Sequence, residues 1–221
     1  MQSYKINSHG DSTLAINFGS GIDENTNNIV HFYINIFEKN IIHEAYILDV
    51  YPTYNSVIID YDFTQIEFLK LKKKIAKIIL QNKIKLNNNN ILEEIIEIPV
   101  NYGGKFGPDL YKMSQSLSLS EDEIISIHST NNYKVFMIGF MPGFPYLGGL
   151  DPRISFPRLT EPRLSIPPGS VGIAGNQTGI YPFSSPGGWN IIGKTDIRLF
   201  DINKIPPNFV KSGTYLRFVV K

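Results

Sequence analysis

The first eighty residues alternate between patterns that are typical of strands and of helices. The segment from Ser12 to Phe18 is strand-like, and Gly19 and Gly21 interrupt it. A helix is expected from about Asp23 to Lys39, because the Asp23 carboxylate can accept hydrogen bonds from the first amides of a helix. This order predicts a small α/β domain at the start of the chain.

A hairpin and a second helix continue the pattern. Residues 46–51 and 56–61 are rich in β-branched and aromatic side chains, and residues 52–55 supply turn residues between them, which predicts a β-hairpin. From about Thr64 to Gln81 the apolar residues recur at spacings of three and four, which predicts an amphipathic helix. The apolar positions of this helix are Phe68, Leu71, Ile75, Ile78 and Ile79. Its lysines point in other directions and are expected to be solvated rather than to bind nucleic acid.

A polar segment, KIKLNNNN at residues 83–90, breaks both periodicities and is the expected linker between domains. We therefore expect an α/β N-terminal domain over residues 1–88 and a second domain over residues 89–221. In the second domain, residues 91–100 and 133–140 are strand-like, and short helices are expected to start at Pro108-Asp109 and at Ser120-Glu121, the latter with Glu123 as a capping partner. From Met141 onward, Gly, Pro and aromatic residues punctuate short strands, which favours a closed β architecture with long loops.

Composition narrows the classes of partner. The formal net charge is +1, so no global field would gather nucleic acid or an anionic membrane. No uncharged apolar run approaches the roughly 20 residues that a membrane-spanning helix needs. The chain has no cysteine, which excludes disulfides and thiolate chemistry and fits a reducing compartment. We expect a cytoplasmic protein that binds neither membrane nor nucleic acid.

The densest candidate chemistry begins at GFMPGFPYLGGL, residues 139–150. Its glycines permit close backbone approach, while Phe144 and Tyr146 offer rigid apolar walls and one hydroxyl group. Such a segment suits a ligand pocket. The alternative is a glycine-rich corner of a barrel whose aromatic side chains belong to the core.

Two arginines follow in a segment that is otherwise poor in charge. Arg158 and Arg163 each come after a proline, and a guanidinium group can hold a carboxylate through two parallel hydrogen bonds. Either arginine could instead form a surface ion pair with Asp151 or Glu161. Sequence leaves these two interpretations open. Of the two arginines, Arg163 is the sharper prediction for the carboxylate contact, because it lies just before the glycine-rich segment SVGIAG.

Further polar candidates lie on both sides of these arginines. Ser170, Gln177 and Tyr181 could orient a lactam through its N–H and C=O groups, or could satisfy backbone groups in tight turns. His128 is a candidate general base, with capping of a helix C-terminus as the alternative role.

A match to the phosphate-binding pattern G-x-x-x-x-G-K-[ST] spans residues 188–195. The following sequence, DIRLFDINKIPP, is typical of a strand and a proline-bounded loop, so no helix N-terminus is expected to meet phosphates there. We interpret residues 188–195 as a buried barrel strand.

Four blocks together carry a family resemblance. They are HGDSTLAINFG at residues 9–19, GGKFGPDL at 103–110, the block at 139–150, and PRLTEPRLSIPPGSVGIAGNQTGIYPFSSPGGWNIIGKT at 157–195. The chain resembles the 5-oxoprolinase B-subunit family, which also contains the sporulation-kinase inhibitor Kip. It is similar as well to allophanate hydrolase subunit 1 and to part of the carboxyltransferase domain of urea carboxylase.

The resemblance implies a fold and a function. The fold would be α+β, with a small α/β N-terminal domain followed by a cyclophilin-like β-barrel domain. The function would be that of one subunit of an ATP-dependent 5-oxoprolinase, inactive alone, which opens 5-oxoproline to glutamate together with subunits C and A. ATP with Mg²⁺ would be the co-substrate of the complex, and no cofactor site is identifiable in this chain. The alternative is a Kip-like inhibitor that binds a sensor histidine kinase.

Overall fold

The computed structural model describes residues 3–82 and 95–221. The chain divides into two compact units, residues 1–91 and residues 92–221. The expected linker at 83–90 and the expected domain boundary at 88/89 lie outside the described residues. Among the helices of the described residues, none is long and apolar enough to cross a membrane.

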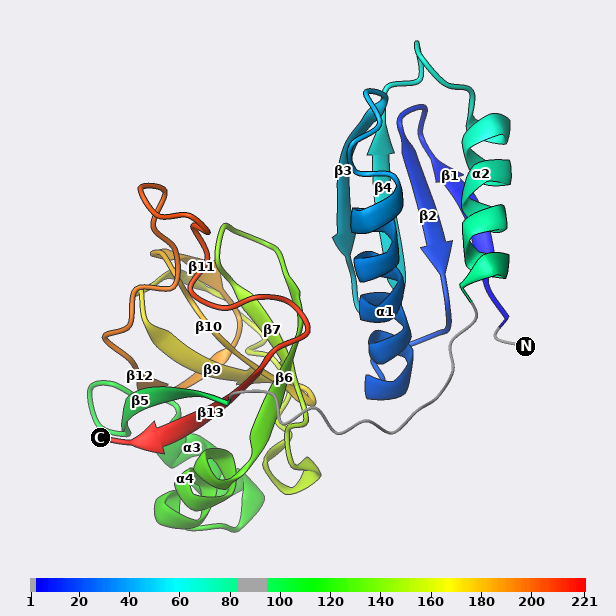
Figure 1. The fold of residues 1–221 in the computed structure, drawn as a ribbon. Coiled ribbons are helices and arrows are strands. Elements are labelled where there is room, and N and C mark those ends of the chain that lie inside the picture. The colour runs from blue at the N-terminus through cyan, green and yellow to red at the C-terminus, as the bar shows by residue number, and fades with distance from the viewer. Residues whose placement is uncertain (1–2, 83–94) are drawn as a thin grey trace. The chain divides into compact units, whose positions relative to one another are not determined.

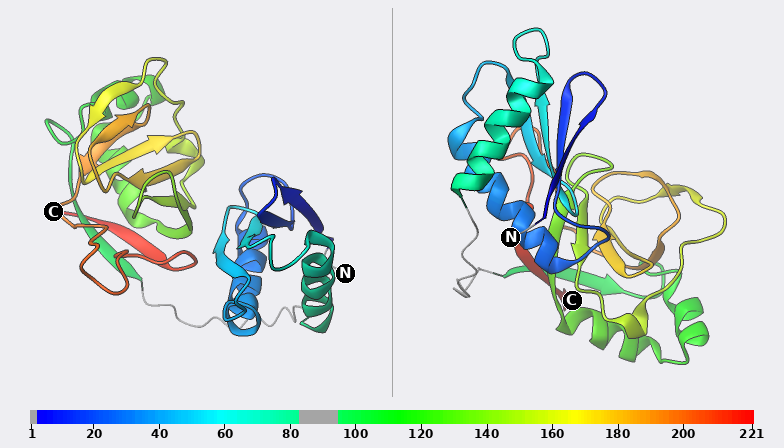
Figure 2. Two further views of the ribbon diagram at one scale, coloured as in Figure 1. Left: turned by 90° about the horizontal axis from the view of Figure 1, so that it is seen from above. Right: turned by 90° about the vertical axis from the view of Figure 1, so that its right-hand side faces the viewer.

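The N-terminal unit is an antiparallel four-stranded sheet with two helices on one face (Figures 1 and 2). The strand order is β1-β2-β4-β3. Its elements are β1 (Lys5–His9), β2 (Thr13–Asn17), α1 (Glu24–Asn40), β3 (Ile47–Pro52), β4 (Ser56–Tyr61) and α2 (Phe68–Gln81).

Local signals in this unit behave largely as the sequence predicts. Asp23 caps α1 by accepting hydrogen bonds from the amides of Asn25 and Thr26 at 3.1 and 2.9 Å. The predicted hairpin forms between β3 and β4. Helix α2 begins at residue 68 rather than 64, because the Asp62 carboxylate binds the amide and hydroxyl of Thr64 and holds that stretch in a turn.

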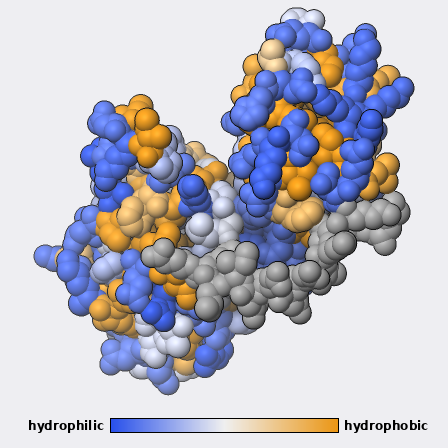
Figure 3. Space-filling model, in the orientation of Figure 1, coloured by the Kyte–Doolittle hydropathy of each residue, from blue (hydrophilic) through white to orange (hydrophobic). Residues whose placement is uncertain are grey.

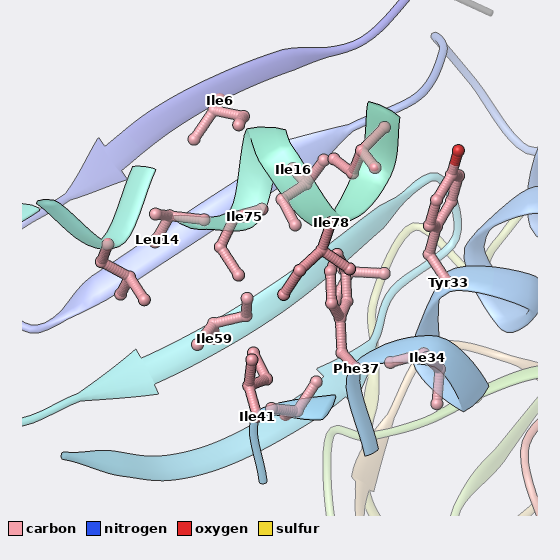
Figure 4. Close-up of a cluster of buried hydrophobic side chains, with 14 of the residues drawn as sticks. Ile6, Leu14, Ile16, Tyr33, Ile34, Phe37, Ile41, Ile59, Ile75 and Ile78 are labelled. Atoms are coloured by element: carbon pink, nitrogen blue, oxygen red, sulfur yellow. The ribbon is translucent and has the colours of Figure 1, made fainter. Parts of the chain in front are cut away.

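A single hydrophobic core joins the sheet to both helices (Figure 4). The helix residues Phe37 and Ile75 are fully buried against the sheet residues Leu14, Ile16 and Ile59. Each helix therefore turns its apolar stripe toward the strands, as the spacing of three and four residues requires.

The second unit is a closed seven-stranded barrel with the order β10-β7-β6-β13-β5-β12-β9. Strands β5 and β13 pair in parallel, and the other neighbours pair antiparallel. A separate two-stranded ribbon, β8 with β11, lies outside this ladder. The mixed helix and strand content, with a small sheet unit followed by a barrel, confirms the predicted fold class.

The barrel unit contains two α-helices, one short 3₁₀ helix and nine strands in the described residues. These are β5 (Ile96–Tyr102), α3 (Leu110–Leu117), α4 (Glu121–Thr130), β6 (Asn132–Ile138), β7 (Pro145–Gly148), η1 (Pro152–Ile154), β8 (Arg163–Ile166), β9 (Ser170–Ala174), β10 (Gln177–Ile180), β11 (Ser185–Gly187), β12 (Asn190–Lys194) and β13 (Tyr215–Val220).

Helix α4 starts with the predicted capping box. The Ser120 hydroxyl accepts from the Glu123 amide at 3.1 Å, and the Glu123 carboxylate accepts from the Ser120 amide at 2.7 Å. Strand β6 ends at residue 138, two residues earlier than expected, because Phe140 has a φ of 70° in the turn that leads to β7. A left-handed conformation cannot continue a strand.

Residues 188–195 contain strand β12, as expected. Gly193 and Lys194 pair with Tyr102 and Asn101 of β5, and Lys194 also pairs with Ser170 of β9. Residues 195–214 contain no helix, so this segment does not lead into a helix N-terminus.

Candidate functional site

The candidate site lies on the outer face of the barrel wall formed by β7, β10 and β9. Successive side chains of a strand point to opposite faces, and Leu147, Thr178, Ile180, Val171 and Ile173 point inward. The alternate positions point outward, and they include Tyr146, Gln177, Tyr181 and Ser170 among the predicted site residues. Strand register thus gathers four predicted residues on one surface.

Four aromatic rings meet on this outer face. The Phe144 ring lies in the centre, with ring centroids 4.9 Å from Tyr146, 5.2 Å from Tyr181 and 5.5 Å from Trp189. The last two contacts are edge-to-face, an arrangement that the ring quadrupoles favour. We call these four residues the aromatic cluster.

Glycine makes room for the aromatic cluster. A Cβ atom at Gly179 would lie 3.1 Å from ring atoms of both Phe144 and Trp189, and 2.9 Å from the Pro145 carbonyl oxygen. Phe144 and Tyr181 are each only 1% exposed. For Phe144 the geometry therefore favours the core role that the sequence left open. Tyr181 also packs in this cluster, a role that the sequence did not predict for it, whereas Tyr146 is half-buried.

Burial and a nearby cation act on the two tyrosine hydroxyls. Burial raises the pKa of Tyr181 to about 12, and the Arg158 charge opposes that rise. Burial also raises the pKa of Tyr146, again against the effect of Arg158. Both hydroxyls are therefore protonated at neutral pH and can donate hydrogen bonds.

Arg158 is exposed and lies against the aromatic cluster. Its guanidinium carbon is 6.0 Å from the centroid of the Trp189 ring, within the range of a cation–π contact. Among the residues that the structure describes, no carboxylate forms an ion pair with Arg158. Asp151, one of the two partners considered for Arg158, binds Arg153 instead.

Arg163 has a different environment. Its Nη2 donates to Asp109 Oδ1 at 2.6 Å, and its Nη1 lies 3.5 Å from the Trp189 carbonyl oxygen. The other Asp109 oxygen accepts from the Ile191 amide at 2.6 Å, and the Asp109 amide donates to the Ile191 carbonyl at 3.0 Å. Asp109 is buried and the Arg163 side chain is 33% exposed, so this is a partly buried ion pair that also holds the start of β12.

Ser170 and Gln177 occupy opposite ends of the β9–β10 ladder. The Ser170 carbonyl accepts from the Tyr181 amide at 2.9 Å, next to Gly169 with a φ of 82°. Gln177 pairs with Ala174 beside the turn at Gly175. Both residues are buried, so the structure places Ser170 next to the aromatic cluster and Gln177 at the far end of the same wall.

His128 is fully buried in the barrel unit rather than on the outer face. Its Nδ1 lies 2.7 Å from the Tyr102 hydroxyl and its Nε2 lies 3.0 Å from Thr178 Oγ1, which donates to the Gly172 carbonyl at 2.9 Å. One consistent arrangement has Tyr102 donating to Nδ1 and Nε2–H donating to Thr178. Burial lowers the pKa of His128 to about 3, so the ring is neutral. The ring thus binds two side chains and not the helix carbonyls that a capping role would require.

Two residues of this region are not identifiable as site residues by the sequence reasoning above. The sequence marks Asp109 only as the start of a helix, and its partner Arg163 is 54 residues away. Trp189 is assigned to a buried strand, although its ring packs on the outer cluster. For Trp189 a signal exists, because it is the only tryptophan of the chain. No group of three or more potential metal ligands occurs within residues 3–82 and 95–221.

Comparison with known proteins places this geometry in a family. Residues 4–210 match the family model for the carboxyltransferase domain, subdomain C and D. The chain is 39% identical to the B subunit of 5-oxoprolinase from Bacillus subtilis, over 98% of this chain and 92% of that protein.

Solved structures share the fold. The crystal structure of TTHA0988 matches 95% of this chain with a TM-score of 0.81 and 29% identity, and the match covers 40% of that longer chain. The urea carboxylase of Kluyveromyces lactis matches 99% of this chain with a TM-score of 0.76, at 18% identity and over 22% of its own length. The latter likeness concerns the fold alone. Taken with the family model and the curated relative, these matches show that the chain belongs to the 5-oxoprolinase B-subunit family, within the proteins that carry carboxyltransferase subdomains C and D.

Proposed function

We propose that this chain is the B subunit of an ATP-dependent 5-oxoprolinase and that it acts in the cytoplasm with subunits C and A. The observation that carries the proposal is the similarity to the B subunit of a 5-oxoprolinase over nearly the full length of both chains. The exposed cation beside the aromatic cluster supports it, because 5-oxoproline is a small ring that bears a carboxylate.

The chemistry explains the need for ATP. The lactam of 5-oxoproline is a stable amide, and transfer of the γ-phosphoryl group of ATP to its oxygen would make the ring carbon electrophilic. Water then adds to that carbon, the C–N bond breaks with the nitrogen taking up a proton, and a second water releases phosphate. The balance is 5-oxoproline, ATP and two waters to glutamate, ADP and phosphate. Mg²⁺ would accompany ATP as the co-substrate of the complex.

In this proposal the barrel unit supplies binding groups rather than a nucleophile. Tyr146 offers a neutral hydroxyl donor next to Arg158. Phe144 and Tyr181 pack beneath that surface as buried residues. Ser170 and Gln177 belong to strands β9 and β10, whose pairing supports it. His128, neutral and engaged on both ring nitrogens, would serve the barrel rather than catalysis. The phosphoryl transfer would depend on residues of the partner subunits.

An apolar loop offers a surface for those partners. Phe200 packs against Phe183 with ring centroids 5.9 Å apart, and the loop tip beyond it carries Ile202 and Ile205, which are 79% and 101% exposed. Figure 3 shows hydrophobic residues at the end of this loop, which Figure 1 draws in orange to red between β12 and β13. With Phe209, which is 47% exposed, these side chains form an exposed apolar surface of the kind that marks protein–protein contacts.

Reconstitution tests the proposal. The chain is mixed with subunits A and C of the same organism, and ATP-dependent glutamate release is measured with each subunit omitted in turn. We expect activity only from the complete set, and no turnover by this chain alone. Activity that persists without this chain, or its absence from the complete set, would contradict the proposal, as would capture of a sensor kinase in place of the other subunits.

The apolar loop can be tested in the same system. Ile205→Asp should weaken association at least tenfold, because it places a charge in a buried contact, while the same change at Leu48, 65% exposed on the N-terminal unit, serves as a matched control. Equal association of Ile205→Asp and the wild type would exclude this loop as the interface.

A further inference from the structure

We propose that the two arginines of the candidate site have different roles. Arg158, which contacts the Trp189 ring, binds the carboxylate of the substrate. Arg163, which pairs with Asp109, positions Trp189. The identity of the ligand rests on the proposed function. The division of roles rests on the contacts of the two side chains.

Arg163 already holds two partners inside the protein. Its Nη2 donates to a buried carboxylate at 2.6 Å and its Nη1 faces the Trp189 carbonyl. A second carboxylate would have to compete with Asp109, which is held in place by two further hydrogen bonds to the backbone of Ile191. The buried Asp109 carboxylate would then lose its ion-pair partner. An unpaired buried charge is unfavourable, which disfavours the exchange.

Arg158 is in the opposite situation. Its guanidinium group faces the Trp189 ring and is exposed, and no carboxylate of the described residues pairs with it. A guanidinium held near an aromatic ring loses little freedom when it binds a carboxylate, since its planar array of donors is already oriented. The Tyr146 ring lies 6.1 Å from the Trp189 ring between centroids, and Arg158 opposes the rise in the pKa of its hydroxyl.

The tie between Asp109 and Arg163 fixes the support beneath Arg158. Asp109 binds both the amide and the carbonyl of Ile191, and Arg163 faces the carbonyl of Trp189, so the segment 189–191 is held from two directions. The Leu159 amide donates to the Gly188 carbonyl at 2.7 Å, which joins the Arg158 segment to the same stretch. The orientation of Trp189 relative to Arg158 therefore depends on the partly buried pair.

Kinetics on the assembled complex separate the two roles. Arg158→Lys keeps the charge but not the two parallel hydrogen bonds, so the KM for 5-oxoproline should rise roughly tenfold to a hundredfold while kcat changes little. The KM for ATP and the melting temperature of the isolated chain should stay at the wild-type values. Arg153→Lys is the matched control, because Arg153 is also an exposed arginine of the barrel unit and pairs with Asp151.

Arg163→Lys and Asp109→Asn should behave as a pair with a different signature. Both should lower the melting temperature and shift the fluorescence of Trp189, which reports on this site without interference in the purified chain, since it is the only tryptophan. Arg158→Lys should leave the melting temperature unchanged. These readouts distinguish a positioning role from direct contact with the substrate.

Binding to the full chain adds an arm that is independent of turnover. The fluorescence of Trp189 is titrated with 5-oxoproline, with 2-pyrrolidone, which has the ring but lacks the carboxylate, and with inorganic phosphate. We expect a response to 5-oxoproline that Arg158→Lys weakens, and none to 2-pyrrolidone at equal concentration. A response to phosphate with a rise in the KM for ATP would assign Arg158 to the nucleotide and overturn the proposal.

The failure of this inference can be told apart from failure of the proposed function. If the wild-type complex releases no glutamate, the proposed function is lost. If the wild-type complex is active and Arg158→Lys has a normal KM for 5-oxoproline, only the role of Arg158 is lost. A raised KM in Arg163→Lys with unchanged melting and fluorescence would show that the roles are reversed.

Discussion

The two units of this chain use aromatic side chains in different ways. In the N-terminal unit, Phe18 and Tyr33 stack with centroids 4.9 Å apart and nearly parallel planes, inside the one core between sheet and helices. In the barrel unit the interior is filled by aliphatic and aromatic residues, and a second cluster around Phe144 packs on the outside of the wall. In the N-terminal unit the aromatic rings belong to the only core described for that unit. In the barrel unit the aromatic cluster around Phe144 is separate from the core inside the barrel.

This difference indicates where function is to be sought. The outer cluster lies beside Arg158, which pairs with no carboxylate of the described residues, and next to the partly buried pair of Asp109 and Arg163. Among described residues 3–82 no charged residue is buried, whereas Asp109 and Lys134 are buried in the barrel unit. Substitutions in the aromatic cluster, which lies beside Arg158, are therefore expected to change both folding and ligand binding. Substitutions in the N-terminal core should change folding alone.

The largest effect should come from truncating one fully buried aromatic ring in each unit. Phe37→Ala and Phe144→Ala each remove a side chain that is at most 1% exposed, so each should cost about 3–5 kcal/mol of the unfolding free energy of its unit. Only Phe144→Ala should also raise the KM for 5-oxoproline. Urea unfolding, followed by Trp189 fluorescence for the barrel unit and by hydrogen exchange for the N-terminal unit, gives the two free energies. A similar rise in KM for Phe37→Ala would break the comparison.

The next largest effect concerns the partly buried ion pair next to the outer cluster. Asp109→Asn removes the charge that Arg163 faces and weakens a hydrogen bond to the Ile191 amide, so we expect a loss of about 2–3 kcal/mol in the unfolding free energy of the barrel unit. A double-mutant cycle with Arg163→Met measures the coupling. The exposed pair of Asp151 and Arg153 is the control and should show little coupling. Additive effects of Asp109→Asn and Arg163→Met would mean that the pair does not stabilise the site.

Features that arise between near neighbours in the chain could be predicted from the sequence. The Asp23 cap, the β3–β4 hairpin and the capping box of Ser120 and Glu123 all depend on residues within a few positions of each other. Strand β1 escaped prediction, because only Ile6 among its five residues is buried and the alternation is weak at such an edge. The closed barrel was expected from the glycine- and proline-rich texture and from the family resemblance.

The candidate site was predicted less completely, because it depends on contacts between distant residues. Sequence marked both arginines and preferred Arg163 for the carboxylate, whereas the structure pairs Arg163 with Asp109, 54 residues earlier in the chain. The glycines near Tyr146 suggested an open pocket, whereas the rings of Phe144 and Tyr181 fill that space. Packing of this kind depends on register between strands, which local patterns do not specify.

A smaller effect is expected from pH. Burial lowers the pKa of His128 to about 3, below its ordinary value near 6.5, so the unfolded chain binds a proton there that the folded chain does not. The contribution of His128 to stability is therefore complete above pH 6.5 and is lost as the pH falls toward 3, at up to about 1.4 kcal/mol per pH unit. His128→Gln should be less stable at pH 7 and should show a shallower loss between pH 6.5 and pH 4.5. Parallel pH profiles of unfolding for the two proteins would contradict this assignment.

The smallest effect is expected at Lys194. It tests the prediction that residues 188–195 do not bind nucleotide phosphates. Lys194 lies in β12, where it pairs with Asn101 and Ser170. The Lys194 charge acts on the nearby Asp196 carboxylate. The pKa of Asp196 is lowered mainly by its hydrogen bond to Lys221 and further by Lys194. A lysine that binds nucleotide phosphates needs a glycine-rich loop that opens a helix, and residues 195–214 form none. Lys194→Ala should thus leave the KM of the complex for ATP within about twofold of the wild type, with Lys221→Ala as the matched control. A selective rise of about tenfold or more in that KM for Lys194→Ala alone would restore the phosphate-binding interpretation, and would place ATP at strand β12, which pairs with β9.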